Sequence, residues 1–405
     1  MADAPNGTIR ELATRAKSAS RRLVALDRAA KDRALAAIAA GLRSRSAEIF
    51  RANELDLAAA RASGMSEALV DRLRFDQKAL ESTAKGVEYV MTLPDPVGSQ
   101  SSLERLPSGI LAGRQRVPLG VIAIVYESRP NVTIDAASLT LKSGNAALLR
   151  GGKEAAHTNR ALGEVLGSAL EASGLPRDAV VIVPPGDRDS IRELVALNGL
   201  VDLAIPRGGE GLIRFVVEHA RVPVVQHYKG VCHLYLDAGA DIEMAKRLAL
   251  NGKVQRPGVC NALECLLVDA AEAERLLPPI AKALLAEGVE LRGDARTQRL
   301  VPEAKAASDE DWGAEYLAKI LAVRVVNGID GALEHVERYG SNHTDAICTE
   351  NYSHAQRWLR EVDASCVLVN ASTRFNDGGQ LGLGAEIGIS TTKMHAYGPM
   401  GLASL

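Results

Sequence analysis

The chain has 405 residues, and its 48 Lys and Arg against 50 Asp and Glu give a formal net charge of −2. Neither sign dominates, so electrostatic capture of nucleic acid or of an anionic membrane is not expected. The hydrophobic share of 47% and charged share of 24% are ordinary for a globular protein, and the length predicts two or three domains. The 2 Trp, 8 Tyr and 4 Phe offer little for stacking on nucleic-acid bases.

The cysteines and the N-terminal sequence indicate the compartment. The five cysteines are an odd number and widely spaced, which fits a reducing environment better than a disulfide framework: Cys232, Cys260, Cys265, Cys348 and Cys366. The polar N-terminal sequence lacks the apolar stretch of a secretory signal, and no apolar run approaches the ~18–20 residues of a membrane helix. We therefore expect a cytoplasmic protein that does not enter a membrane.

The N-terminal region is predicted to be helical. From Ile9 to about Leu80 the apolar residues recur at helical spacing, and the many arginines between them are interpreted as the solvated faces of packed helices. After a break at residues 94–98, Leu103 to Val117 reads as two short strands around a Pro-Ser-Gly turn. This segment could form an arm that extends from a domain.

The following region alternates strands and helices. Buried strands are predicted at Val121–Tyr126 and Ala146–Leu149 on either side of a helix at Asp135–Leu141, and again at Val180–Val183 and Leu200–Ile205. This order predicts an α/β fold with a parallel sheet covered by helices. Ligands of such sheets bind at the carboxyl ends of the strands, so the loops there are candidate sites.

Three of these loops combine glycine with charged side chains. They are residues 127–131 (ESRPN), 150–153 (RGGK) and 206–211 (PRGGEG). Glycines let backbone amides approach an anion, and neighbouring cations add charge, so the three loops together favour a phosphate-bearing ligand. The sequence has neither GxGxxG nor a phosphate loop that ends in Gly-Lys-Ser/Thr, so neither a standard Rossmann fingerprint nor a nucleoside triphosphatase is predicted.

A candidate nucleophile is Cys260, in the segment QRPGVCNA. A thiol on a Pro-Gly turn is flanked by backbone amides that can lower its pKa and hold an oxyanion, although a cysteine among Val, Ala and Leu can also be simply buried. Both interpretations remain open from the residues alone. No CxxC, HExxH or GxSxG motif is present, and the neighbours Cys232 and His233 are expected in the core, so no metal site is predicted.

The sequence resembles the gamma-glutamyl phosphate reductases, also called glutamate-5-semialdehyde dehydrogenases, of the aldehyde dehydrogenase superfamily. The blocks that carry the resemblance span nearly the whole chain: VPLGVIAIVYESRPNVT at 117–133, LKSGNAALLRGGKEA at 141–155, DLAIPRGGEGLI at 202–213, QRPGVCNA around Cys260, GSNHTDAI at 340–347, NASTRF and DGG within 370–379, and GLGAEIGIST at 382–391. The resemblance implies a Rossmann-like cofactor domain (residues 1–104, 119–226 and 365–390), an α/β catalytic domain (227–364) and a small oligomerisation arm (105–118 and 391–405).

The resemblance also implies a reaction. Cys260 would attack the acyl phosphate of L-glutamyl 5-phosphate, and NADPH would reduce the resulting thioester to L-glutamate 5-semialdehyde in proline biosynthesis. The side-chain amide of Asn131 would join the oxyanion hole. The superfamily position of the water-activating glutamate falls on His227, and the lack of a carboxylate there would protect the thioester from hydrolysis, although a histidine could still act as a base.

Further site residues follow from the resemblance. Two cations after the second strand favour NADP(H) over NAD, and Glu315 would hold the nicotinamide ribose, unless it is a surface carboxylate. The predicted cofactor-binding residues are Arg150, Gly151, Gly152, Lys153, Arg207, Gly208, Gly209, Gly211 and Glu315. The candidate substrate-binding residues are Arg129, Ser341, His343, Thr344 and Arg374. Expected partners are the small-molecule substrate, a second copy of the chain in a dimer or tetramer, and glutamate 5-kinase.

Two rival functions stay open. A hydrolytic aldehyde dehydrogenase would turn over without phosphate, and a non-enzymatic nucleotide-binding protein would have an unreactive Cys260. The sequence also departs from the family, with Tyr397 where Arg is usual, Leu381 where Phe is usual, and an end at Leu405 before the final strand of most members. Because C-terminal strands of this superfamily pair with the arm of a neighbouring subunit, the missing strand puts the oligomer geometry in question more than the chemistry.

Overall fold

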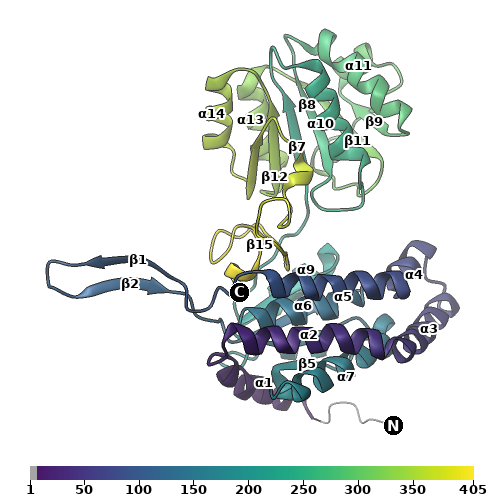
Figure 1. Ribbon diagram of the computed structural model, residues 1–405. Coiled ribbons are helices and arrows are strands. Elements are labelled where there is room, and N and C mark those ends of the chain that lie inside the picture. The colour runs from purple at the N-terminus through teal and green to yellow at the C-terminus, as the bar shows by residue number, and fades with distance from the viewer. Residues whose placement is uncertain (1–6) are drawn as a thin grey trace. The chain divides into compact units, whose positions relative to one another are not determined.

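The computed structural model describes residues 7–405, which form two compact units (Figure 1). The first unit runs to Gln226 and also takes Leu383–Gly388 and Met400–Leu405, and the second comprises His227–Gly382 and Ile389–Pro399. Residues 365–382, expected with the cofactor domain, lie instead in the second unit. The reason is that strand β13 (Cys366–Val369) pairs in parallel with β12 (Thr344–Cys348).

Five helices open the first unit. They are α1 (Ile9–Leu23), α2 (Arg28–Ser44), α3 (Ser46–Ala62), α4 (Glu67–Leu73) and α5 (Gln77–Thr92). The Thr8 side chain and the Glu11 carboxylate cap α1 reciprocally, satisfying amides that a helix start leaves without partners. Leu35, Ile38 and Leu42 are fully buried, so the predicted helical spacing of the apolar residues is confirmed.

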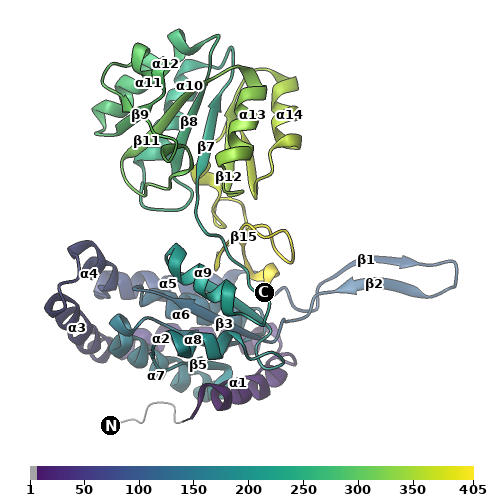
Figure 2. The ribbon, with the colours of Figure 1, turned by 180° about the vertical axis from the view of Figure 1, so that it is seen from behind.

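A four-stranded parallel sheet forms the core of this unit, in the order β5-β4-β3-β6. Its strands are β3 (Val121–Tyr126), β4 (Ala146–Arg150), β5 (Val180–Ile182) and β6 (Leu203–Arg207). The connecting helices are α6 (Asn131–Lys142), η1 (Lys153–Ala155), α7 (Ala156–Ala172), η2 (Arg177–Ala179), α8 (Arg188–Val195) and α9 (Glu210–His219). Helices α2, α5, α6 and α7 pack together on one face, and Figure 2 shows α8 and α9 on the other. The predicted parallel sheet is confirmed.

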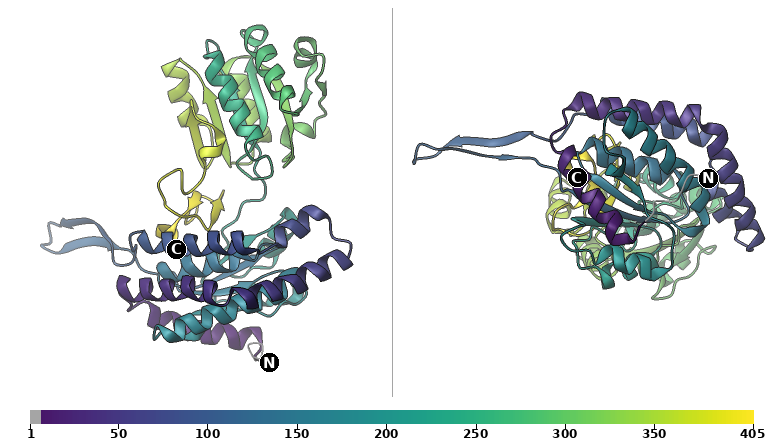
Figure 3. Two further views of the ribbon diagram at one scale, coloured as in Figure 1. Left: turned by 45° about the vertical axis from the view of Figure 1, so that its right-hand side comes forward. Right: turned by 90° about the horizontal axis from the view of Figure 1, so that it is seen from below.

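A β-hairpin extends from the first unit (Figure 3). Its antiparallel strands β1 (Gln100–Arg105) and β2 (Leu111–Gln115) are exposed along their length, and the turn between them contains Pro107, Ser108 and Gly109 as predicted. Several large apolar side chains lie exposed there: Leu103, Leu106, Ile110, Leu111 and Val117. The first strand begins before the predicted arm boundary at residue 105.

The second unit is built on a seven-stranded sheet in the order β10-β9-β11-β8-β7-β12-β13, whose paired strands run parallel. Its strands besides β12 and β13 are β7 (Cys232–Leu236), β8 (Leu263–Asp269), β9 (Glu290–Gly293), β10 (Lys305–Ala306) and β11 (Ile320–Val326). Its helices are α10 (Ile242–Val254), α11 (Ala273–Ala286), α12 (Ala295–Leu300), η3 (Asp311–Gly313), α13 (Gly328–Tyr339), α14 (Tyr352–Glu361) and η4 (Thr373–Phe375). One buried cluster joins α10 and α11 to the sheet, and another joins α13 and α14 to it.

The C-terminal residues differ from the predicted arm. Strand β14 (Gly388–Ser390) pairs with β15 (Gly398–Met400), so residues 391–405 do not add to the hairpin. After η5 (Leu402–Ser404) the Leu405 carbonyl accepts hydrogen bonds from the Leu119 backbone and the Asn145 side chain, and these bonds hold the chain end on the first unit. Among residues 7–405 no helix combines the length and hydropathy needed to cross a bilayer.

Candidate active site

The three predicted anion-binding loops follow β3, β4 and β6 of the first unit. These strands are neighbours and run parallel, so their carboxyl ends share one edge of the sheet. The glycines of the third loop lie at the start of α9, where Gly209 is the N-cap, and Gly208, Gly209 and Gly211 are all exposed. The Glu127 carboxylate from the first loop accepts a hydrogen bond from the Gly209 amide at 3.0 Å. The structure thus brings the predicted loops together at one sheet edge.

Asn131, the predicted oxyanion donor, begins helix α6 on the same edge. Its side-chain amide donates to the Asp135 carboxylate, Nδ2 to Oδ2, at 2.9 Å. Burial raises the pKa of Asp135 to about 6, while the bond from Asn131 and the charge of Arg207 oppose the shift. An amide carries two N–H groups, so Asp135 fixes the orientation of Asn131 and leaves its second N–H for another acceptor. Sequence reasoning did not identify Asp135, although its spacing four residues after Asn131 is the signal that could have found it.

The two predicted cations after β4 differ in availability. Arg150 is buried, and its guanidinium donates to the backbone oxygens of Gly186 at 2.6 Å and of Gly151 at 3.2 Å. Burial lowers the pKa of Arg150. Lys153 is exposed at the start of η1. Lys153 is therefore better placed than Arg150 to contact a phosphate group of a ligand. Arg150 instead stabilises the loops that contain Gly151 and Gly186.

Gly151 lies where the backbone packs closely. A Cβ there would come within 2.2 Å of the Asn159 side-chain nitrogen, so no larger residue fits without displacing it. A cavity lined by Gly151, Gly152, Gly163 and Gly167 opens beside this loop along α7. Arg129 is exposed after β3, and the Arg207 side chain packs close to Gly388.

In the second unit, Cys260 lies on a turn between α10 and β8. The helix ends at Val254, the Pro257-Gly258 pair reverses the chain, and Cys260 is half-buried. The thiol of Cys232, on β7, donates to the Cys260 carbonyl oxygen with S···O 3.2 Å, and a Cβ at Gly230 would lie only 1.9 Å from that oxygen. These contacts with Cys232 and Gly230 restrain the turn, and the half-buried Cys260 is not enclosed in the core. It lies at the amino end of β8, whereas the glycine loops lie at strand carboxyl ends.

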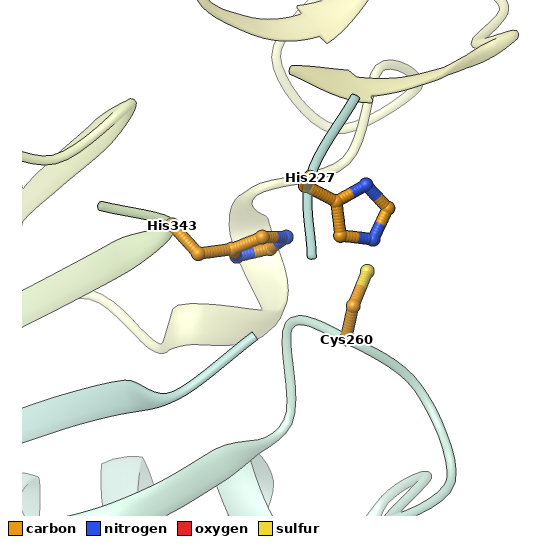
Figure 4. A group of neighbouring side chains, drawn as sticks. All are labelled: His227, Cys260 and His343. Carbon is orange, nitrogen blue, oxygen red and sulfur yellow. The ribbon is translucent and has the colours of Figure 1, made fainter. Parts of the chain in front are cut away.

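Two histidines accompany this cysteine (Figure 4). His227 is half-buried, and its Nδ1 lies 3.0 Å from the carbonyl oxygen of Ile389. His343 is fully buried, and burial lowers its pKa to about 3. Its Nδ1 lies 2.7 Å from Oγ1 of Thr344. In Figure 4 both rings and the sulfur of Cys260 are turned toward one another.

A buried ion pair lies beneath the turn. Lys253 Nζ and Glu264 Oε2 are 2.5 Å apart, and both side chains are fully buried. Burial lowers the pKa of Lys253 and raises that of Glu264 to about 7. The Glu315 carboxylate accepts the Gly230 amide at 3.0 Å. Glu315 is therefore a partly buried loop carboxylate rather than a free surface group, and its predicted role toward a nicotinamide ribose stays a prediction.

The candidate substrate residues of this unit divide into two groups. Ser341 accepts the Val231 amide at 2.8 Å, and Thr344 accepts from Asn376 at 2.7 Å, so both hydroxyls have structural partners. Arg374 is different, because it donates to the Gln255 side chain at 3.1 Å and also contacts the Asn261 side chain. Gln255 and Asn261 flank Cys260 in the sequence, so Arg374 holds the turn from both sides. Burial lowers the pKa of Arg374, and the neighbouring Arg256 adds to this effect.

The profile of the Aldehyde dehydrogenase family matches residues 1–299. The chain belongs to this family. It is similar to a gamma-glutamyl phosphate reductase of Sorangium cellulosum (strain So ce56), with 64% identity over 98% of this chain and 95% of that protein. A gamma-glutamyl phosphate reductase of Desulfatibacillum aliphaticivorans is 54% identical over 99% of this chain and 96% of its own. The crystal structure of gamma-glutamyl phosphate reductase from Thermotoga maritima matches with a TM-score of 0.97 and 43% identity, covering 98% and 96% of the two chains.

These matches confirm the predicted resemblance and the aldehyde-dehydrogenase-like α/β fold. The protein is thus an oxidoreductase of a family that uses a nicotinamide cofactor. The first unit offers features that fit such a cofactor: an exposed Lys153, close-packed Gly151, and exposed glycines at the start of α9. Backbone amides and a cation of this kind suit a pyrophosphate or a phosphorylated ribose.

Proposed function

We propose that this protein reduces L-glutamyl 5-phosphate to L-glutamate 5-semialdehyde and phosphate, the step named by its relatives, through a thioester on Cys260. The observation that carries the proposal is the half-buried cysteine on a pinned turn with His227 beside it. The identity of 64% to a gamma-glutamyl phosphate reductase over almost the whole chain supports the choice of substrate. This reaction belongs to proline biosynthesis.

His227 is suited to accept the proton of the thiol. Its Nδ1 faces a carbonyl oxygen, which can only accept, so the neutral ring carries its hydrogen on Nδ1. The other nitrogen, Nε2, then presents a lone pair on the side of the ring that faces Cys260 (Figure 4). The resulting thiolate attacks the carbonyl carbon of the acyl phosphate, a C–S bond forms, and the C–O bond to phosphate breaks.

Asn131 is proposed as a donor to the oxyanion that develops during this attack. Its orientation by Asp135 supports the role, because a pre-oriented donor needs no reorganisation when charge develops. Loss of one such donor typically lowers kcat by about 10²–10³-fold.

The cofactor is proposed to be NADPH, which supplies the hydride that reduces the thioester carbon. Lys153 would meet the 2′-phosphate of its adenine ribose, and Arg150 would keep the surrounding loops in place. Gly208, Gly209 and Gly211 at the start of α9 would approach the pyrophosphate, and Glu315 would meet the nicotinamide ribose.

The phosphate-releasing reaction is favoured over hydrolysis by the residue at position 227. A carboxylate that activates water there would destroy the thioester before reduction, and the chain has a histidine at this position instead. Arg374 and the neighbouring Arg256 offer positive charge close to the turn, which suits an anionic substrate.

Steady-state kinetics in the oxidative direction test this proposal. With L-glutamate 5-semialdehyde and NADP⁺, NADPH formation should require inorganic phosphate, and a Cys260→Ser variant should be inactive while it still binds NADPH. The matched control is Cys366→Ser, which removes a half-buried thiol on β13 and should keep full activity. Equal turnover without phosphate would instead indicate a hydrolytic dehydrogenase, and an active Cys260→Ser variant would refute the proposed nucleophile.

Assembly and location are also proposed. The exposed apolar side chains of the β1–β2 hairpin support its use as an oligomerisation arm, in a dimer or tetramer. No disulfide joins the five cysteines, all of which lie among the described residues, and this supports a reducing cytoplasm. Direct transfer of the labile acyl phosphate from glutamate 5-kinase is a further proposal that an interaction assay with the kinase can test.

A further inference from the structure

Soft metal-ligand atoms surround the candidate nucleophile. His227 begins the second unit, Cys260 lies on the turn before β8, and His343 lies directly before β12. One ligand atom from each of these three residues lies within 4.8 Å of the other two. Figure 4 shows the sulfur and both imidazole rings facing the same small space. No sequence motif predicts this cluster, because the three residues come from separate segments of the chain that the sheet brings together.

The orientation of His227 suits a metal ligand. Its Nδ1 donates to the Ile389 carbonyl oxygen at 3.0 Å, so in the neutral ring the hydrogen is on Nδ1 and the lone pair is on Nε2. Metal-ligating histidines usually donate their second ring N–H to a carbonyl or carboxylate, which fixes the tautomer and the ring orientation. His227 therefore already has the outer contact that such a ligand needs.

His343 supplies an independent observation. Its side chain is completely buried, and its Nε2 has no hydrogen-bond partner among the described residues. A buried polar atom without a partner is rare and calls for an explanation such as a bound ion. Its Nδ1 lies 2.7 Å from the Thr344 hydroxyl oxygen, which can accept a hydrogen bond and leave Nε2 free to bind metal.

We propose that Cys260, His227 and His343 form a reversible Zn²⁺ site that blocks the nucleophile. One thiolate and two imidazoles are ligands that zinc prefers. Tetrahedral geometry with Zn–N and Zn–S bonds of about 2.0 and 2.3 Å places ligand atoms about 3.3–3.5 Å apart. The present spacing of up to 4.8 Å therefore needs the ligand side chains to approach one another by about 1 Å. The exposed side of the half-buried cysteine leaves a fourth position for water.

A second cluster in the same unit shows why the first is distinctive. His233, Cys265 and His335 also place three ligand atoms within 4.8 Å, but all three residues are fully buried. The guanidinium of Arg324 donates to Nδ1 of His335 at 2.9 Å, so the hydrogen of that ring is on Nε2, the nitrogen 3.5 Å from the Cys265 sulfur. A protonated nitrogen cannot bind a metal. The cluster of His233, Cys265 and His335 therefore lacks one of the three ligands that the cluster of His227, Cys260 and His343 offers.

Zinc binding exchanges one bond for another without any change in oxidation state. The S–H bond of Cys260 breaks, its proton passes to solvent, and the thiolate forms a Zn–S bond. Binding itself does not depend on the proposed reaction. Inhibition does rest on it, because a zinc-bound sulfur no longer attacks the acyl phosphate only if Cys260 is the nucleophile.

Zinc affinity measured by competition with a chromophoric chelator tests the site on the full chain, reduced with a non-chelating phosphine. The wild type should bind one Zn²⁺, and Cys260→Ser, His227→Gln and His343→Gln should each weaken that binding by more than about 100-fold. The expectation follows because even loss of an outer contact typically costs about 10- to 100-fold. The matched controls Cys366→Ser and His354→Gln, at a thiol and an imidazole that do not belong to the cluster, should bind Zn²⁺ as the wild type does. Unchanged affinity in His343→Gln would overturn the proposal.

Two measurements on the wild type avoid dependence on variants that fail to fold. Co²⁺ should give an intense thiolate-to-metal charge-transfer band with the visible spectrum of a tetrahedral site. Zn²⁺ should slow alkylation of Cys260 by at least about tenfold without slowing that of Cys366, as measured by peptide mass spectrometry. Equal protection of both thiols, or of neither, would refute the site. If Zn²⁺ protects Cys260 yet leaves the phosphate-dependent activity unchanged, the metal site stands and the proposed nucleophile fails.

Discussion

Replacement of Asp135 should change the stability of the protein and its kcat in opposite directions. Its carboxylate lies on α6, accepts the Asn131 amide and is largely buried. Burial raises its pKa to about 6, while the facing charge of Arg207 moderates the shift. In the unfolded chain an aspartate titrates at ~3.9. The folded protein therefore binds this proton more tightly than the unfolded chain does.

The sign of the pH effect follows directly. Below pH ~4 the carboxyl is protonated in both states and costs nothing, and above pH 6 it is ionised in both, so stability is lost as the pH rises between these values. Since one pKa unit corresponds to about 1.4 kcal/mol, a shift from ~3.9 to about 6 costs the folded state up to about 3 kcal/mol at pH 7. Partial solvent access makes this an upper bound.

Asp135→Asn should remove that cost, because an asparagine oxygen can still accept the Asn131 amide. We expect the variant to be more stable than the wild type at pH 7 by up to about 3 kcal/mol, and the difference to shrink toward pH 4.5. Chemical unfolding at several pH values measures it, with Asp309→Asn as a control at an exposed carboxylate. A constant difference across the range would refute the linkage argument.

Catalysis should change in the opposite direction. The amide at position 135 can also rotate to present its N–H groups, and then Asn131 loses its fixed orientation. We expect kcat to fall about tenfold with little change in KM, a smaller loss than the about 10²–10³-fold expected for removing the oxyanion donor itself. The kcat–pH profile of the wild type should have a limb near pH 6 that follows the ionisation of Asp135, and this limb should be absent in the variant. Unaltered kcat and pH profile would show that Asp135 does not position Asn131.

Three other changes test the remaining parts of the site. Lys153→Ala should raise KM for NADPH at least about tenfold while leaving KM for NADH within about twofold, and equal effects on both would contradict its contact with the 2′-phosphate. Lys253→Met should destabilise the protein by about 3–5 kcal/mol in chemical unfolding because it leaves Glu264 buried without its cation, and the double variant with Glu264→Gln should recover part of the loss. Gly230→Ala should lower kcat by at least about tenfold without altering NADPH affinity, because the new Cβ would displace the turn of the nucleophile. Gly86→Ala on α5, where a Cβ meets nothing within 4 Å, should be neutral in the same assay.

The fold of the first unit could be predicted from the sequence because its signals are local. The run VIAIVY forms β3 with the predicted limits, and every residue in it is buried. The glycine-bearing loops were found for the same reason, since each follows a strand that the pattern identified. The assignment of residues 365–382 failed because strand pairing is non-local, and only the parallel register of β13 with β12 reveals it.

The site could be predicted only in part. Cys260 was marked by its Pro-Gly turn, and the motif it belongs to carried the resemblance. The sequence alone does not distinguish the role of Arg150 from that of Lys153. The guanidinium of Arg150 donates to the carbonyl oxygens of residues 186 and 187, and only the structure reveals these hydrogen bonds. The sequence also does not predict that the rings of His227 and His343 lie next to each other, since this contact depends on the spatial order of the strands. Contacts across long sequence separations are the part that composition and periodicity do not encode.

The nucleophile can be tested most directly by a single-turnover measurement in the absence of phosphate. When the wild type is mixed with L-glutamate 5-semialdehyde and NADP⁺, one equivalent of NADPH should form per active site, and intact-protein mass spectrometry should find a glutamyl adduct on Cys260. Added phosphate should then release the adduct and restore turnover. A missing adduct during full phosphate-dependent turnover, or an adduct on another residue, would contradict the thioester on Cys260.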